Sequence, residues 1–284
     1  MTATSPAVPA AAPTAVPPTA RHANFGHFML AEWTKIRSVR STVWTLLLFV
    51  VLTVGFTSLF TWLTESNWTG GNGAATRDAT IVANPVGFIL GAGIGLGQLT
   101  ICVLGVLVIT SEYSTGVIRS SLLAVPKRQP MLAAKGAVFG LLILVIAEIV
   151  AFACFFLGSS ILHSKVPVSI SDQNVTRAVI GAGLYLAVLG ILALAVGLLI
   201  RHTAAGITTV IGIVLVLPIL SGLLPGSWGA HLNAYLPEQA GSVVYSAHQT
   251  SDQLLSAWQG FGVFCLWTAV LLAAGAYLLQ RRDA

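Results

Sequence analysis

Few residues in this sequence could perform chemistry, and the clearest is Glu148, the one Asp, Glu, Lys or Arg inside any of its long apolar runs. It follows Gly136 by twelve residues, or ~18 Å along a helix, which is close to the middle of a membrane. An ionised carboxylate is costly there, so we expect it to face protein or water. Two interpretations stay open: a substrate or proton site, and a structural hydrogen bond to a neighbouring helix, for which Gln98 is the candidate partner.

Other catalytic and metal-binding patterns are missing from the sequence. The six histidines are scattered, and there is no HExxH, GxSxG or GxxxxGK[ST] arrangement. The three cysteines fall far apart inside apolar runs and are expected to be packing residues. We therefore expect no catalytic residue, no metal site and no cofactor bound by this chain.

The composition indicates that lipid is the solvent for most of the chain. Hydrophobic residues make up 56% of the sequence and charged residues only 8%, whereas soluble domains carry roughly 25% charged residues. The net charge of +5 is spread in ones, twos and threes beside apolar segments. That distribution is typical of membrane-protein loops and argues against nucleic-acid binding.

Six apolar runs are each close to or above the roughly 20 residues that cross a bilayer. Because lipid offers no hydrogen-bond partners, these runs should be helices, which predicts an all-α integral membrane protein. The fifth run is the shortest, and Pro218 near its outer end predicts a kink. The predicted spans are 43–63, 86–110, 136–157, 178–200, 206–224 and 258–279.

The distribution of basic residues predicts the orientation. With the N-terminus inside, eleven Lys and Arg residues fall in cytoplasmic segments and three in outer loops. This positive-inside bias predicts that both termini are cytoplasmic.

The chain divides into three predicted regions. Residues 1–23 form an Ala- and Pro-rich tail that we expect to be disordered. Residues 24–41 have a 3.6-residue apolar period with Lys35 and Arg37 on the polar face, which predicts an amphipathic helix in the headgroup layer. An ordinary cytoplasmic helix packed on another protein is the alternative. Residues 42–282 form the six-span domain.

Glycines recur at helical spacing in two spans. Gly87, Gly91 and Gly95 predict one close helix contact, and Gly93 with Gly97 predicts another. The fourth span repeats the pattern with glycines seven residues apart, at positions 183, 190 and 197.

Two connections are long enough to form structure. The 111–135 loop predicts a short cytoplasmic helix from Ser114 to Ala124, suited either to docking a soluble partner or merely to anchoring the loop. The 225–257 connection is too apolar for a free loop and too rich in Pro and Gly for a span. Short helices that dip into the outer leaflet are expected there.

The block after the second span, with Glu112, Gly116, Arg119 and Lys135, resembles the permease subunits of type-2 ATP-binding-cassette transporters. The segment Ala31–Ser38, which is similar to actinobacterial members, and the long outer connection fit the same resemblance. The motifs that carry the resemblance match the family in order and spacing, and together they cover nearly all of residues 24–282.

The resemblance implies a function and site residues. The chain would be the membrane-spanning half of an ATP-driven exporter in the plasma membrane, paired with a second permease copy or a homologue. A separate ATPase subunit would hold ATP and Mg²⁺, so the chain itself would not be an enzyme. A coupling helix would contact that ATPase, and short re-entrant helices would precede the last span. The implied ATPase-facing residues are Glu112, Tyr113, Gly116 and Arg119, and those of the interfacial helix are Glu32, Trp33, Lys35 and Arg37.

Two alternatives remain open. A secondary transporter or channel would need no ATPase and would rely on Glu148. A non-transporting anchor or sensor subunit would use the same docking loop.

Overall fold

A computed structural model describes residues 25–68, 75–114, 128–248 and 253–281, and within these ranges the regular structure is entirely helical. The predicted tail, and Gly116, Arg119 and most of the predicted coupling helix, lie outside the described residues.

Six helical segments are long and apolar enough to cross a membrane, which confirms the all-helical, six-span prediction. Most extend beyond the predicted limits because helices continue past the hydrocarbon layer, whereas the fifth ends slightly earlier. The segments are α2 (Arg40–Ser66), α4 (Pro85–Ser114), α6 (Arg128–Leu162), α7 (Val175–Ile200), α8 with η1 and α9 (together Thr203–Gly222), and α12 (Ala257–Arg281).

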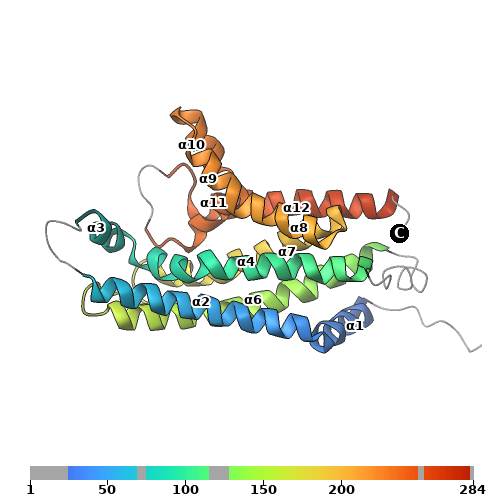
Figure 1. Cartoon of the computed structure of the whole chain (residues 1–284), viewed down its shortest axis with the longest axis horizontal. Helices are drawn as coiled ribbons and strands as arrows, with labels where there is room; N and C mark the ends of the chain where they lie inside the picture. The colour runs from blue at the N-terminus through green and yellow to red at the C-terminus, as the bar shows by residue number, and fades with distance from the viewer. Residues whose placement is uncertain (1–24, 69–74, 115–127, 249–252, 282–284) are drawn as a thin grey trace, which may run out of the picture.

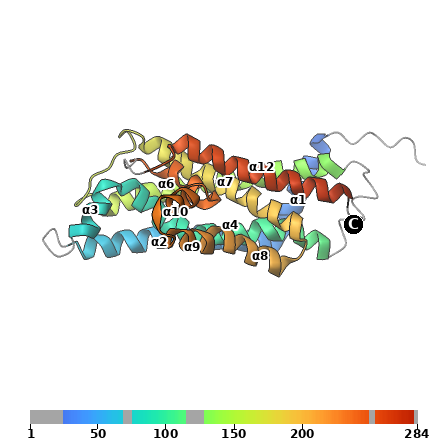
Figure 2. The ribbon, with the colours of Figure 1, turned by 90° about the horizontal axis from the view of Figure 1, so that it is seen from above.

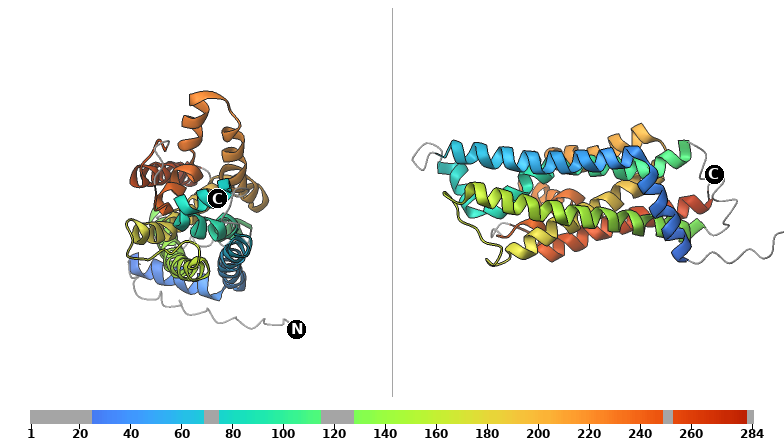
Figure 3. Two further views of the ribbon diagram at one scale, coloured as in Figure 1. Left: turned by 90° about the vertical axis from the view of Figure 1, so that its left-hand side faces the viewer. Right: turned by 90° about the horizontal axis from the view of Figure 1, so that it is seen from below.

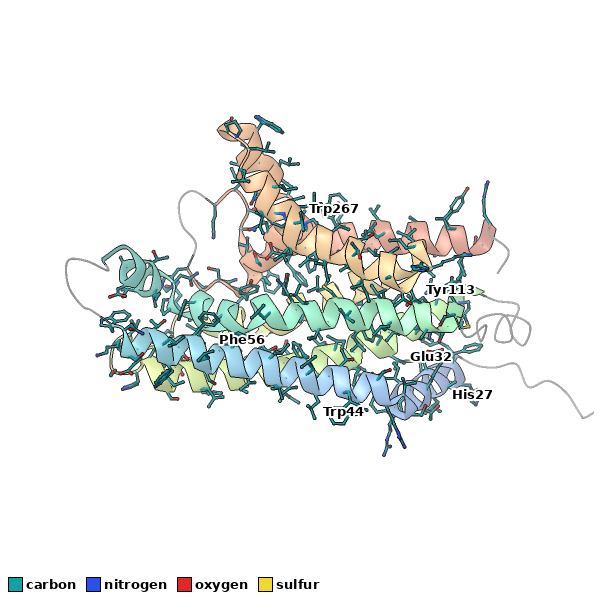
Figure 4. All side chains as sticks on the ribbon, in the orientation of Figure 1. His27, Glu32, Trp44, Phe56, Tyr113 and Trp267 are labelled. Atoms are coloured by element: carbon teal, nitrogen blue, oxygen red, sulfur yellow. The ribbon has the colours of Figure 1, made fainter. Side chains whose placement is uncertain are left out.

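Helix α7 is the centre of the bundle. About 72% of its apolar stretch is buried, against 17% for α2 and 22% for α12. It packs against α4, α6 and α12, and Figure 2 shows α8 and α12 on opposite sides of it. The helices around α7 present their large apolar side chains outward, as Trp44 of α2 does at 70% exposure, consistent with lipid contact (Figure 4).

The fifth span is helical throughout, but its hydrogen-bond pattern changes next to Pro218, where the sequence predicted a kink. Helix α8 (Thr203–Ile211) passes into one π-helical segment, η1 (Gly212–Val216), before α9 (Leu217–Gly222) begins. Proline has no N–H to donate to the carbonyl four residues earlier, so the regular hydrogen-bond ladder is interrupted here. Helix α9 contacts η1 and the next helix, α10. Helices α9 and α10 rise away from the bundle in Figures 1 and 3.

Helices α2 and α4 approach closely along a line of small residues. A Cβ added to Gly93 or Gly97 would collide with Thr53 or Thr57 of α2. We call these four residues the threonine–glycine seam. The predicted contact of Gly93 and Gly97 is therefore confirmed, but the predicted contact on the other face is wrong, because Gly91 and Gly95 have open space where a Cβ would be.

The glycines of α7 are packing positions, as predicted. A Cβ on Gly183 would meet Glu148, one on Gly190 would meet Phe139 at 3.2 Å, and one on Gly197 would meet Ile109 at 2.7 Å. They let α6 and α4 lie close to the central helix.

Shorter helices lie at the two ends of the bundle. Helix α1 (Phe25–Ser38) crosses the end of α6 in Figure 3, and extended backbone at Val39 separates it from α2. Helix α3 (Ala75–Ala83) lies at the opposite end in Figure 1. The predicted short helices before the last span are present as α10 (Gly226–Ala234), α11 (Pro237–Ser242) and the 3-10 turn η2 (Val243–Tyr245).

Candidate functional site

Four charged side chains from three helices form an ion network where α1 meets the bundle. Lys135 of α6 donates to Glu32 of α1 at 2.5 Å and to Glu112 of α4 at 2.6 Å. Lys35 of α1 donates to the same Glu112 oxygen. We refer to Glu32, Lys35, Glu112 and Lys135 as the ion network; two positive and two negative groups make it neutral overall.

Most of the ion network is buried. The exposed fractions are 1% for Lys135, 5% for Glu112 and 8% for Glu32, whereas Lys35 is partly exposed. Buried charges are tolerated when each is paired, and removing one partner leaves the others uncompensated. The network therefore holds α1 against the ends of α4 and α6 and resists separation of these three helices.

The space beside the network is small. A cavity of about 90 Å³ is lined by Ile36, Leu104 and Val108 together with the network residues. Ligand pockets usually measure about 300–1,000 Å³, so this cavity is too small for a substrate.

The other side of α4 is tied to the fourth and fifth spans. The Arg201 guanidinium stacks over the Tyr113 ring at 5.0 Å from its centroid, within cation–π range. Arg201 caps α7 in a left-handed conformation with φ of 58°. Thr203 of α8 donates to Thr110 of α4 at 2.9 Å. The connection between α7 and α8 is thus a tight turn against the end of α4.

The sequence-predicted site residues have different surroundings in the structure. Glu112 is buried in the ion network, where Lys35 and Lys135 both donate to its carboxylate. Tyr113 is partly buried under Arg201. On α1, Glu32 faces inward (Figure 4). Trp33, at 45% exposure, and Arg37 are exposed.

Sequence reasoning missed Lys135 as a site residue. Lys135 was noted only as the last residue of the block that resembles the permease family, and it was given no role there. In the structure it joins the start of α6 to both α1 and the end of α4.

Glu148 and Gln98 are not partners. The Tyr185 hydroxyl donates to the Gln98 side-chain carbonyl at 2.6 Å. Glu148 packs against Gly183, and its Oε2 atom is buried without a hydrogen-bond partner among the described residues. The predicted link between these two side chains is wrong, because Tyr185, fully buried on α7, reaches Gln98 instead.

Within the described ranges, no three His, Cys, Asp or Glu residues lie close enough together to hold a metal ion. No protein-family model matches the chain, and no curated protein matches it significantly.

Proposed function

We propose that this chain is the membrane-spanning permease subunit of an ATP-driven exporter of the ATP-binding-cassette type. It forms the substrate pathway in the plasma membrane, and a separate ATPase subunit supplies the energy. A second permease copy or a homologue completes the pathway.

The ion network is the observation that carries this proposal. Glu112 lies three residues before residues 115–127, the segment proposed to contact the ATPase. Its carboxylate is held by Lys35 of α1 and Lys135 of α6. A push on that segment would pass directly to α1 and to the second and third spans. Coupling between sites needs such a contiguous physical connection.

The positions of the helix ends support the predicted orientation, in which both termini are cytoplasmic. Helix α1 and the end of α12 lie at one end of the bundle in Figure 1. Lys35 and Arg37 are on α1, Arg281 is at the end of α12, and Lys135 contacts α1 from α6. Basic residues favour the cytoplasmic side, so both termini would be inside. Helix α1 would then lie in the inner headgroup layer, and α10 and α11 would be the re-entrant helices of the outer leaflet.

One observation favours a secondary transporter as the second candidate. The buried Oε2 atom of Glu148 has no partner within the described residues, and an intramembrane carboxylate of this kind can serve as a proton or ion site. Transport by this route would need no ATPase.

Affinity purification of the full chain in mild detergent, followed by mass spectrometry, separates the candidates. The exporter predicts a stoichiometric partner with a phosphate-binding Walker sequence, and Arg119→Glu should weaken its recovery. Lys165→Glu, on the outer loop, is the matched charge-reversal control. A folded chain that recovers no ATPase would reject the exporter and favour the secondary transporter.

ATPase recovery alone does not distinguish an exporter from a non-transporting anchor. Reconstitution of the complex into vesicles does so, because only a transporter shows ATPase activity stimulated by a transported compound.

A further inference from the structure

A large cleft opens at the end of the bundle away from the ion network. It has a volume of about 780 Å³ and lies between the fifth span with α10 on one side and α11, η2 and the start of α4 on the other. It exists because α9 and α10 leave the bundle at the π-helical segment (Figure 1). Pockets of about 300–1,000 Å³ enclose drug-sized ligands, so this cleft has the capacity for a ligand.

The walls of the cleft are fixed by amide side chains. Asn233 donates to the Pro218 carbonyl at 2.9 Å and to the Ser221 hydroxyl at 2.7 Å, which joins α10 to α9. Asn84 donates to the Ser246 hydroxyl at 2.8 Å, which joins the start of α4 to the segment after η2. These bonds give the cleft a defined shape.

The lining is polar, and its one basic side chain is His231, whose Nδ1 atom lies 2.7 Å from the Ser227 carbonyl oxygen. None of the residues that line the cleft is Asp, Glu, Lys or Arg. The nearby Arg177 guanidinium is already engaged, since it donates to the carbonyls of Val244 at 3.1 Å and Ser246 at 2.8 Å. A phosphate, sulfate or carboxylate would therefore find neither Lys nor Arg in this lining to offset its desolvation.

Several neutral donors and acceptors in the lining remain available. The side chains of Ser227, Gln239 and Gln253 line the cleft and make no hydrogen bond to other described residues. Leu224, Leu254 and Leu255 supply an apolar part of the same lining. A ligand that matches both parts has uncharged hydroxyl groups at one end and an apolar chain at the other.

From this lining we infer that the outer cleft is a binding site for an uncharged sugar, carried on an apolar tail as in a glycolipid or on its own as a soluble glycoside. The sugar hydroxyls would bond to the side chains of Ser227, Gln239 and Gln253, and the tail would lie along the leucines. Only the interpretation of the cleft as a site for a transported substrate rests on the proposed export function. Binding itself is a property of the chain alone.

The test uses the full chain in nanodiscs that contain equal amounts of digalactosyl diacylglycerol and phosphatidylglycerol in phosphatidylcholine. Native mass spectrometry then counts which lipid stays bound. We expect the sugar lipid to be retained over the anionic lipid. Gln239→Leu and Gln253→Leu should each reduce that retention about 3- to 10-fold, the value of one lost neutral hydrogen bond.

Gln280→Leu is the matched control, because Gln280 is exposed near the other end of α12. Equal retention of both lipids, preference for phosphatidylglycerol, or unchanged retention in both cleft variants would overturn the assignment. Free lactose distinguishes the sources: displacement of the bound lipid identifies a soluble sugar as sufficient, and no displacement identifies a glycolipid. ATPase recovery is measured separately, so a failed sugar site does not count against the permease.

Discussion

At the residue scale, Lys135 shows what hydropathy cannot reveal. Its two carboxylate partners are 23 and 103 residues away in sequence. A basic residue beside a span predicts a cytoplasmic end, but only the packed bundle selects its partners. The same holds for Gln98, whose buried partner Tyr185 lies 87 residues away.

Replacing Lys135 tests the ion network. Lys135→Met leaves Glu32 and Glu112 buried with less positive charge beside them, and we expect a loss of about 3 kcal/mol in stability. Thermal unfolding in detergent, followed by tryptophan fluorescence, measures the effect. Lys165→Met, in an exposed loop, should leave the midpoint unchanged.

A second change makes the Lys135 prediction sharper. Adding Glu112→Gln to Lys135→Met removes one of the uncompensated acids and should recover part of the loss. If Lys135→Met unfolds at the same temperature as the unchanged chain, the network is not a stabilising connection.

Glu238 of α11 makes stability depend on pH. Burial raises the pKa of Glu238 from 4.5 to about 7. The folded chain therefore holds this proton more tightly than the unfolded chain. Its contribution is fully present below pH 4.5 and is lost as the pH rises through about 7.

We expect the unfolding midpoint to fall by a few degrees between pH 5 and pH 8, and Glu238→Gln to remove most of that change. Glu65→Gln, near the end of α2, is the control and should keep the full pH dependence. An unaltered pH profile in Glu238→Gln would place the titrating group elsewhere.

At the element scale, the spans were predictable and their contacts only in part. Long apolar runs give the six spans because a bilayer requires helices of that length. The glycine spacing of α4 indicated two contact faces, but one of them, with Gly91 and Gly95, faces open space. Spacing shows which glycines share a face, whereas the neighbouring helix decides which face is covered. The irregularity in the fifth span was predictable from Pro218, but the cleft beside it was not.

The threonine–glycine seam predicts a strong difference between two glycines of the same helix. Gly97→Val places methyl groups against Thr53 and should cost about 1–3 kcal/mol by overpacking. Gly95→Val adds the same atoms where nothing lies within 4 Å and should be nearly neutral. Unfolding of the two variants in the same detergent gives the comparison. Equal midpoints would show that α2 and α4 do not approach along this line.

At the scale of the whole molecule, the bundle combines a buried central helix with outer helices that are buried on one side only. Helix α7 is largely buried, whereas α2, α12 and the fifth span expose most of their apolar stretches. The ion network fastens one end of the molecule, and the cleft opens the other. This division fits a protein that receives a mechanical input at one face and handles a ligand at the opposite face.

The orientation of the bundle can be measured with single cysteines. The native cysteines at positions 102, 154 and 265 are first replaced with alanine. In intact cells a membrane-impermeant maleimide should label Ser164→Cys, on the predicted outer loop. Gln280→Cys should be labelled after permeabilisation alone. Labelling of Gln280→Cys in intact cells would invert the proposed topology.

Evolutionary substitutions should accumulate at different positions in this protein than in a soluble helical bundle. The large apolar side chains of α2, such as Trp44 and Leu47, face outward. One hydrophobic residue can replace another at these positions. The small residues of the threonine–glycine seam have no room for exchange. Variation among descendants of this sequence should therefore gather on its bulkiest hydrophobic positions, while its least conspicuous residues stay constant.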